Sequence, residues 1–186
     1  MSLVLLYKDE LVTDQRCSML YPHALGCFYN ATKMRIAANG TFAIGIVGPT
    51  LSPKEFDVLE AVITTAFKET KGDLAQVEIG HEEWLKQRGN MSFLVMTKKC
   101  SYFSYLPWES VEGHSRGLSE VKVPTLVQYN SSLPAGAGTG LHVASLAVRE
   151  GVKMKELMYL VSRVISSVGP EFDYVHRKTL KAFKYV

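Results

Sequence analysis

The first 48 residues contain two successive β-hairpin patterns, and this feature constrains the fold more than any other. The turn Lys8-Asp9-Glu10 separates an apolar run, which begins at the second residue, from renewed strand character that ends at Asp14-Gln15-Arg16. Asn39-Gly40, a strong hairpin signal, separates an alternating strand over 32–36 from an apolar strand over 41–48. Consecutive hairpins predict antiparallel sheets and not a doubly wound parallel sheet.

A helix with clear start and stop signals follows these hairpins. Ser52 is a good N-cap, Pro53 occupies the first helical position, and Glu55 completes a capping box. Apolar residues recur on one face, and Lys71-Gly72 ends the pattern. The sequence therefore predicts a long amphipathic helix directly after the second hairpin.

The rest of the chain alternates between strand and helix patterns, and Ser18–Asn30 is interpreted as a loop. Antiparallel strands with segregated helices indicate the α+β class. A short helix is predicted over 81–88, followed by a hairpin of 92–97 and 101–106. A strand is predicted over 121–129, and Pro124 marks it as an edge strand or a bulge. The small-residue segment 131–140 opens a helix over 141–150, a second helix covers about 154–168, and closing strands cover 172–175 and 180–186.

Composition excludes several classes of protein. The 186 residues are 47% hydrophobic and 21% charged with a net charge of +3, which predicts one compact domain over 1–186. No apolar run approaches the roughly 20 residues of a membrane span, and no signal peptide is recognisable. Three cysteines without metal spacing predict a reducing, cytoplasmic setting, and scattered basic residues predict no nucleic-acid partner.

Five strings in order resemble one family: Tyr7–Arg16, Thr32–Met34, Gly40–Gly48, Gly136–Gly138 and Asp173. The family is that of the proteasome β-subunits and their bacterial relatives among the N-terminal-nucleophile (Ntn) hydrolases. The resemblance covers nearly the whole chain and is weakest over 73–120. It implies a four-layer αββα sandwich.

The resemblance also implies a catalytic arrangement. In the family, the side chain of the mature first residue is the nucleophile, and its own α-amino group, with an ordinary pKa near ~8, is the general base. Asp14 and Lys33 match the aspartate and the lysine that support this amine. Counting back from Tyr7 places the nucleophile near Leu3, with Ser2 one residue upstream, and removal of Met1 would expose a serine amine.

Two positions depart from the family pattern. Gly136-Ala137-Gly138 lacks the hydroxyl that the family places beside the amine, and the adjacent Thr139 is the candidate substitute. The stretch 165–170 lacks the family's acid. We therefore expect a catalytically degenerate protein that acts through self-assembly or binding.

Two alternatives remain open at this level. The first is an active peptidase or amidohydrolase that uses Ser2 with Lys33 and Asp14, with backbone amides near Gly45 to Gly48 stabilising the oxyanion. The second is an unrelated α+β binding module, which predicts that the charged atoms of Asp14 and Lys33 lie well beyond ~6 Å from each other.

Partners follow from the resemblance, which implies a homo-oligomer of the ring or dimer type and a peptide or protein ligand. A short chain of this kind resembles those encoded by bacteria or phages, which would place it in the host cytoplasm. No cofactor is expected, because the glycines of 136–140 lack an upstream βαβ unit. No metal is expected either, because His81-Glu82-Glu83 lacks the second histidine of a zinc helix, with Leu85 at that position.

Overall fold

The structure is a computed structural model that describes residues 3–21, 24–28, 32–48, 51–79, 91–105, 125–129 and 134–185. The N-terminal half contains β1 (Leu3–Tyr7), β2 (Glu10–Asp14), β3 (Cys17–Tyr21), β4 (Ala24–Phe28), β5 (Met34–Ile36), β6 (Phe42–Val47) and α1 (Pro53–Glu69). The C-terminal half contains β7 (Ser92–Thr97), β8 (Ser101–Tyr105), β9 (Thr125–Tyr129), β10 (Ala135–Gly138), α4 (Leu141–Arg149), α5 (Met154–Val164), β11 (Phe172–His176) and β12 (Ala182–Tyr185).

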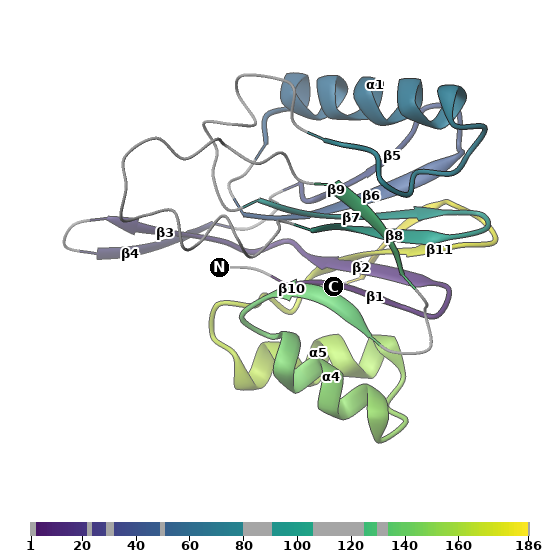
Figure 1. Ribbon diagram of the computed structural model, residues 1–186. Helices are drawn as coiled ribbons and strands as arrows, with labels where there is room; N and C mark the ends of the chain where they lie inside the picture. The colour runs from purple at the N-terminus through teal and green to yellow at the C-terminus, as the bar shows by residue number, and fades with distance from the viewer. Residues whose placement is uncertain are drawn as a thin grey trace, which may run out of the picture.

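Apart from β3 and β4, which form a separate two-stranded sheet, these elements form four layers (Figure 1). Helix α1 covers one sheet of order β5-β6-β7-β8-β9, and helices α4 and α5 cover a second sheet of order β10-β1-β2-β11-β12. A separate hydrophobic cluster fills each of the three interfaces between layers. The predicted α+β class and the αββα sandwich are therefore confirmed.

The first hairpin is buried on both faces, as its apolar sequence predicts. Leu3 and Leu5 of β1 pack toward α4 and α5, whereas Val4 and Leu6 pack between the two sheets. The sheets approach each other closely at Gly45, where an added Cβ would lie 2.5 Å from Cγ2 of Val4. Because side chains alternate along β1, successive residues of this strand face α4 and α5 or the opposite sheet in turn.

Helix α1 begins where the capping box predicts. The Glu55 amide donates to Ser52 Oγ at 3.3 Å, and the Ser52 amide donates to Glu55 Oε2 at 2.7 Å. Arg35 of β5 holds the helix on its sheet through ion pairs with Asp57 and Glu60, and these acids raise the pKa of Arg35. The helix is thus fixed by its own cap and by one cation of the edge strand.

Three predicted elements differ from the structure. Ser18–Asn30, interpreted as a loop, contains the paired strands β3 and β4, because a pairing partner overrides weak strand propensity. Gly136-Ala137-Gly138 does not open a helix but lies in β10, paired with β1. Helix α5 ends at Val164 and not near 168, because Ile165 is extended, with ψ of 102°. The predicted short helix over 81–88 lies outside the described residues.

The remaining predicted elements match the structure. The strands of the second, third and last hairpins appear as β5–β6, β7–β8 and β11–β12. Strand β9, whose predicted N-terminal part with Pro124 lies outside the described residues, is an edge strand of its sheet. None of the described helices is long and apolar enough to cross a membrane.

Candidate functional site

Asp14 is the centre of the candidate site. It is the last residue of β2, and its side chain is fully buried. Oδ1 accepts a hydrogen bond from the Leu3 amide at 2.8 Å, and Oδ2 accepts one from the Gly169 amide at 3.3 Å. Because a buried carboxylate must be compensated, these donors and one cation fix its position.

Lys33 supplies that cation. Its residue precedes β5 in the opposite sheet and is 5% exposed, and its Nζ lies 2.8 Å from Asp14 Oδ1. The ammonium group also donates to the main-chain oxygen of Arg16, just after β2. The ion pair therefore joins the two sheets, and the separation well beyond ~6 Å expected of an unrelated binding module is not observed.

The register of β1 defines what lies beside this pair. The Leu3 side chain is a hydrocarbon with no nucleophilic atom, and it is fully buried in the cluster under α4 and α5. Its amide nitrogen, however, donates to Asp14. Ser2, the predicted nucleophile, lies outside the described residues, and that amide nitrogen belongs to the Ser2–Leu3 peptide bond.

Strand β10 approaches β1 at the same place. Gly138 is the register partner of Leu3, and Ala137 is the partner of Val4. A Cβ at Gly136 would lie 2.5 Å from the Val4 carbonyl oxygen, so glycine permits this close approach. Thr139 is exposed in the turn after β10, and within the described part of the chain it makes no hydrogen bond to Asp14 or Lys33.

The stretch Gly45 to Gly48 was predicted to supply oxyanion donors. The Ile46 amide cannot do so, because it already donates to the Lys33 carbonyl oxygen at 2.9 Å. Gly45 is a packing residue between the sheets. Gly48 follows the end of β6 with a φ of 130° and is exposed, so it is a candidate donor within this stretch.

Two contributions to the site were missed at the sequence level. Gly169 was assigned no role in the site from the sequence, but its amide holds Asp14, and a Cβ there would lie 2.8 Å from Arg16 Cβ. The Arg16 carbonyl that accepts from Lys33 is a main-chain atom. Neither contribution has a side-chain signal, because both are made by main-chain atoms.

No protein-family model matches the chain, and no curated protein matches it. The fold is similar to that of eukaryotic HslV from Trypanosoma brucei, with a TM-score of 0.58 and 13% identity over 99% of each chain. It is also similar to Anbu (ancestral beta-subunit) from Yersinia bercovieri, with a TM-score of 0.52 and 9% identity over 99% of this chain and 87% of the other. The chain thus has the fold of the proteasome-like Ntn hydrolases.

Proposed function

We propose that the chain is an Ntn hydrolase that cleaves amide bonds with Ser2 as its nucleophile. The observation that carries the proposal is the hydrogen bond from the Leu3 amide to Asp14, the carboxylate that is paired with Lys33. It ties the residue after Ser2 to a buried ion pair of the composition that this chemistry requires. The proposal needs a mature chain that begins at Ser2.

Strand alternation supports Ser2 over its neighbours. Val4 and Leu6 face the space between the sheets, whereas Leu3 and Leu5 face α4 and α5. Because side chains alternate with a period of two, the residue before Leu3 is predicted to share the face of Val4. Lys33 comes from the opposite sheet on that side. The count from Tyr7 that placed the nucleophile near Leu3 is therefore refined to Ser2.

Each group then has a defined role. The Ser2 hydroxyl oxygen attacks the substrate carbonyl carbon, and its proton passes to the Ser2 α-amine. The positive charge of Lys33 lowers the pKa of that amine, which keeps it neutral near pH 7 and able to accept the proton. Asp14 is a positioning residue that holds Lys33, and the Gly48 amide is the proposed donor to the oxyanion. The α-ammonium group then gives this proton to the substrate nitrogen, and the C–N bond breaks to release an amine and leave an ester on Ser2. Water hydrolyses this ester to the acid and the free serine hydroxyl.

Covalent labelling tests this function. A β-lactone that acylates N-terminal serine or threonine is expected to modify the chain once and to fail with Ser2→Ala and Lys33→Met. Thr65→Ala, which removes an exposed hydroxyl group on α1 and outside the site, is the matched control and should be labelled like the parent. Labelling that survives in Ser2→Ala would overturn the proposal.

The second candidate is a catalytically degenerate protein that acts through self-assembly. Ala137 in place of a hydroxyl residue and the missing acid over 165–170 favour it. Apolar side chains on the outer helix layer are exposed and would suit a contact between copies: Leu146, Tyr159, Leu160 and Val164. This candidate predicts no labelling in any variant, and an oligomer by sedimentation that Leu146→Glu with Val164→Glu dissociates. A cytoplasmic location and a bacterial or phage source remain predictions.

A further inference from the structure

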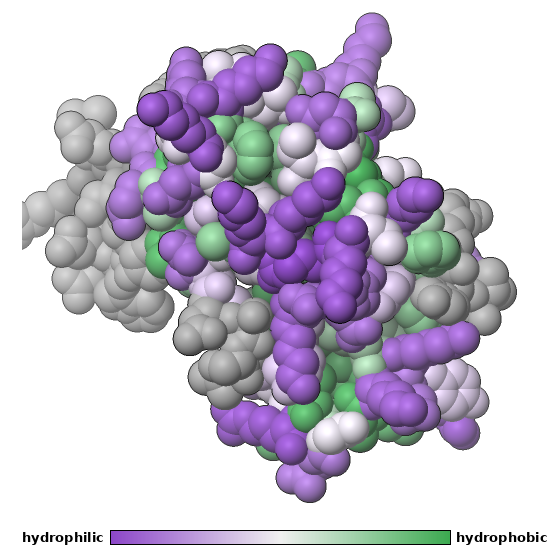
Figure 2. Space-filling model, turned by 90° about the vertical axis from the view of Figure 1, so that its right-hand side faces the viewer, coloured by the Kyte–Doolittle hydropathy of each residue, from purple (hydrophilic) through white to green (hydrophobic). Residues whose placement is uncertain are grey.

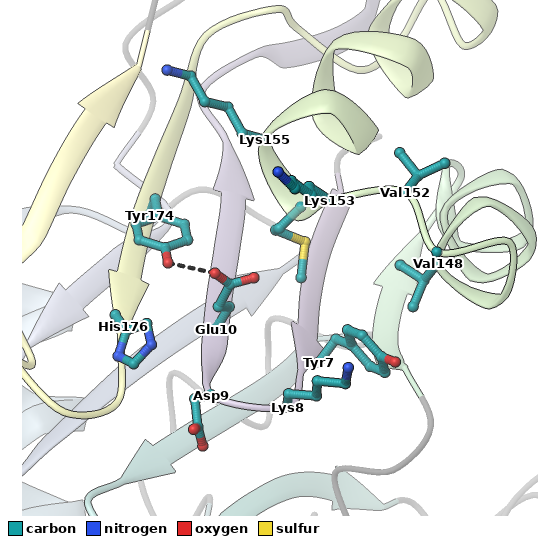
Figure 3. A pocket seen from close by; sticks show the side chains of 12 residues that line it. Tyr7, Lys8, Asp9, Glu10, Val148, Val152, Lys153, Lys155, Tyr174 and His176 are labelled. Carbon is teal, nitrogen blue, oxygen red and sulfur yellow. Dashed lines mark hydrogen bonds between the residues drawn. The ribbon is translucent and has the colours of Figure 1, made fainter.

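A pocket lies at the end of the first hairpin that is remote from Asp14. It has a volume of about 500 Å³ and lies between the β1–β2 turn, β11 and the loop that joins α4 to α5 (Figure 3). Pockets of roughly 300–1,000 Å³ are the usual size for small-molecule sites. Figure 2 views the molecule from this end and shows polar side chains over most of it, with small apolar areas between them.

One side of the pocket is apolar. Val148 of α4 and Met154 of α5 are each 5% exposed, and Val152 of the connecting loop packs with them against the same core. Figure 3 shows Val148 and Val152 together on this side, away from the polar residues of the sheet. These buried side chains form a fixed surface on which an apolar ligand group can lose contact with water.

The opposite side is polar and already ordered. The Tyr174 hydroxyl donates to Glu10 Oε1 at 2.6 Å, and His176 lies beside them on β11 (Figure 3). Asp9, the other acid of the lining, is neutralised by Arg177, whose Nε lies 2.8 Å from Asp9 Oδ1. Among the residues that line the pocket, Glu10 is therefore the one acid without such an ion pair.

Two lysines of the lining, Lys8 and Lys153, outnumber this acid. Lys8, Lys153 and Lys155 line it, and all three are exposed. Figure 3 shows Lys153 and Lys8 on either side of the space between the apolar and polar sides, while Lys155 extends away from it. The Lys8 ammonium lies 5.0 Å from the centre of the Tyr7 ring, which keeps it at the rim. The pocket thus combines an excess of positive charge with an apolar wall.

We propose that this pocket binds a small organic anion, with its acid group between Lys8 and Lys153 and its apolar body against Val148, Val152 and Met154. The charge excess selects for a negative head group, and the buried wall selects for an apolar or aromatic body. Because the pocket and the Asp14–Lys33 pair lie at opposite ends of the hairpin, binding does not depend on the proposed hydrolase activity.

Three probes with one body and different head groups test the proposal: 4-phenylbutyrate, 4-phenylbutanol and 4-phenylbutylamine. Binding is followed by amide chemical shifts of the full chain. The carboxylate is expected to bind with a Kd on the order of 1 mM, as its size predicts, and about tenfold more tightly than the alcohol. The shifted amides should be those of residues 7–10, 148–155 and 174–176.

Charge-removing variants give the control. Lys153→Met and Lys8→Met keep unbranched side chains and are each expected to weaken the carboxylate about fivefold to tenfold. Lys54→Met, at an exposed position of α1, should leave the Kd unchanged. The proposal would be overturned if the amine bound as tightly as the carboxylate, or if Lys153→Met and Lys54→Met had equal effects on the Kd. It would also be overturned if the carboxylate caused no saturable shifts at concentrations about tenfold above its expected Kd.

Discussion

A buried cation lies at each end of the sandwich, and the two are used differently. Arg177, which follows β11, donates from all three guanidinium nitrogens: to Asp9, to the carbonyl oxygens of Lys8, Thr97 and Cys100, and to Ser101 Oγ, at 2.6–3.1 Å. These five bonds use every donor that the guanidinium group has. Arg177 thereby joins the β1–β2 and β7–β8 turns, which belong to different sheets.

Lys33 also joins the two sheets, but it does so at the N-terminal end of β1. Its partner Asp14 is fully buried, whereas the acid that pairs with Arg177 has a side chain that is 48% exposed. A buried ion pair contributes little net stability, because desolvation offsets its attraction. Arg177 therefore holds two turns together, whereas the Asp14–Lys33 pair lies where the proposed mechanism needs a cation beside the Ser2 amine.

The largest expected difference between the two ends is in reactivity. Lys33→Met should reduce the rate of Ser2 acylation about 10²-fold or more, because the α-amine loses the charge that keeps it neutral. Arg177→Met should change that rate less than about threefold at temperatures where it is folded, because it acts at the remote end. The acylation rates can be measured by mass spectrometry. Equal losses of rate in Lys33→Met and Arg177→Met would contradict the proposed difference between the two ends.

The next largest expected effect is on the free energy of unfolding. Asp14→Ala leaves the Lys33 ammonium buried without its carboxylate, so the free energy of unfolding should fall by about 3–5 kcal/mol. The double variant Asp14→Ala with Lys33→Met should recover part of this loss, since no charge is then stranded. Urea unfolding of the four proteins of this cycle measures the coupling, and strictly additive losses would contradict a buried ion pair.

Arg177→Met should cost less, about 2–3 kcal/mol, because several of its acceptors are main-chain carbonyls that water can reach once the turns separate. The loss should be local. Amide exchange is expected to speed up in the β1–β2 and β7–β8 turns while the Leu3 amide, bonded to Asp14, keeps its protection. Faster exchange at Leu3 itself would show that the two ends are not independent.

The smallest effect concerns alkaline pH at the Arg177 end. Burial raises the pKa of Tyr102, whose hydroxyl lies 3.5 Å from the Gly72 carbonyl oxygen. The unfolded chain therefore ionises first, so stability is complete below the ordinary tyrosine pKa of about 10 and falls as pH rises above it. Tyr102→Phe should flatten this alkaline slope slightly in unfolding experiments, and an unchanged slope would contradict the assignment.

The sequence predicted what local patterns determine. The turn at Asn39-Gly40, the capping box at Ser52 and the apolar runs of the first hairpin depend on neighbours in the chain, and all three appear in the structure. Asp14 and Lys33 were matched through resemblance, and the structure places them in contact. Their predicted chemical roles await the experiments above.

Long-range pairing was not visible in the sequence. The run Ala135–Gly138 has no strand propensity of its own and becomes a strand only because β1 offers a partner. The role of Arg177 in joining two turns was missed for the same reason, since its acceptors lie in turns far away along the chain. In a sequence, an arginine after a strand looks the same whether its side chain joins two turns or is solvated.

The intact mass of the chain isolated from its native source tests the central claim most directly. The proposed mechanism uses the α-amine of Ser2 as its base, so a chain that begins at Ser2 is required. We expect a single species whose mass corresponds to removal of Met1, and an N-terminal peptide that starts Ser2-Leu3-Val4. A chain that retains Met1, or any residue ahead of Ser2, would contradict catalysis by this serine.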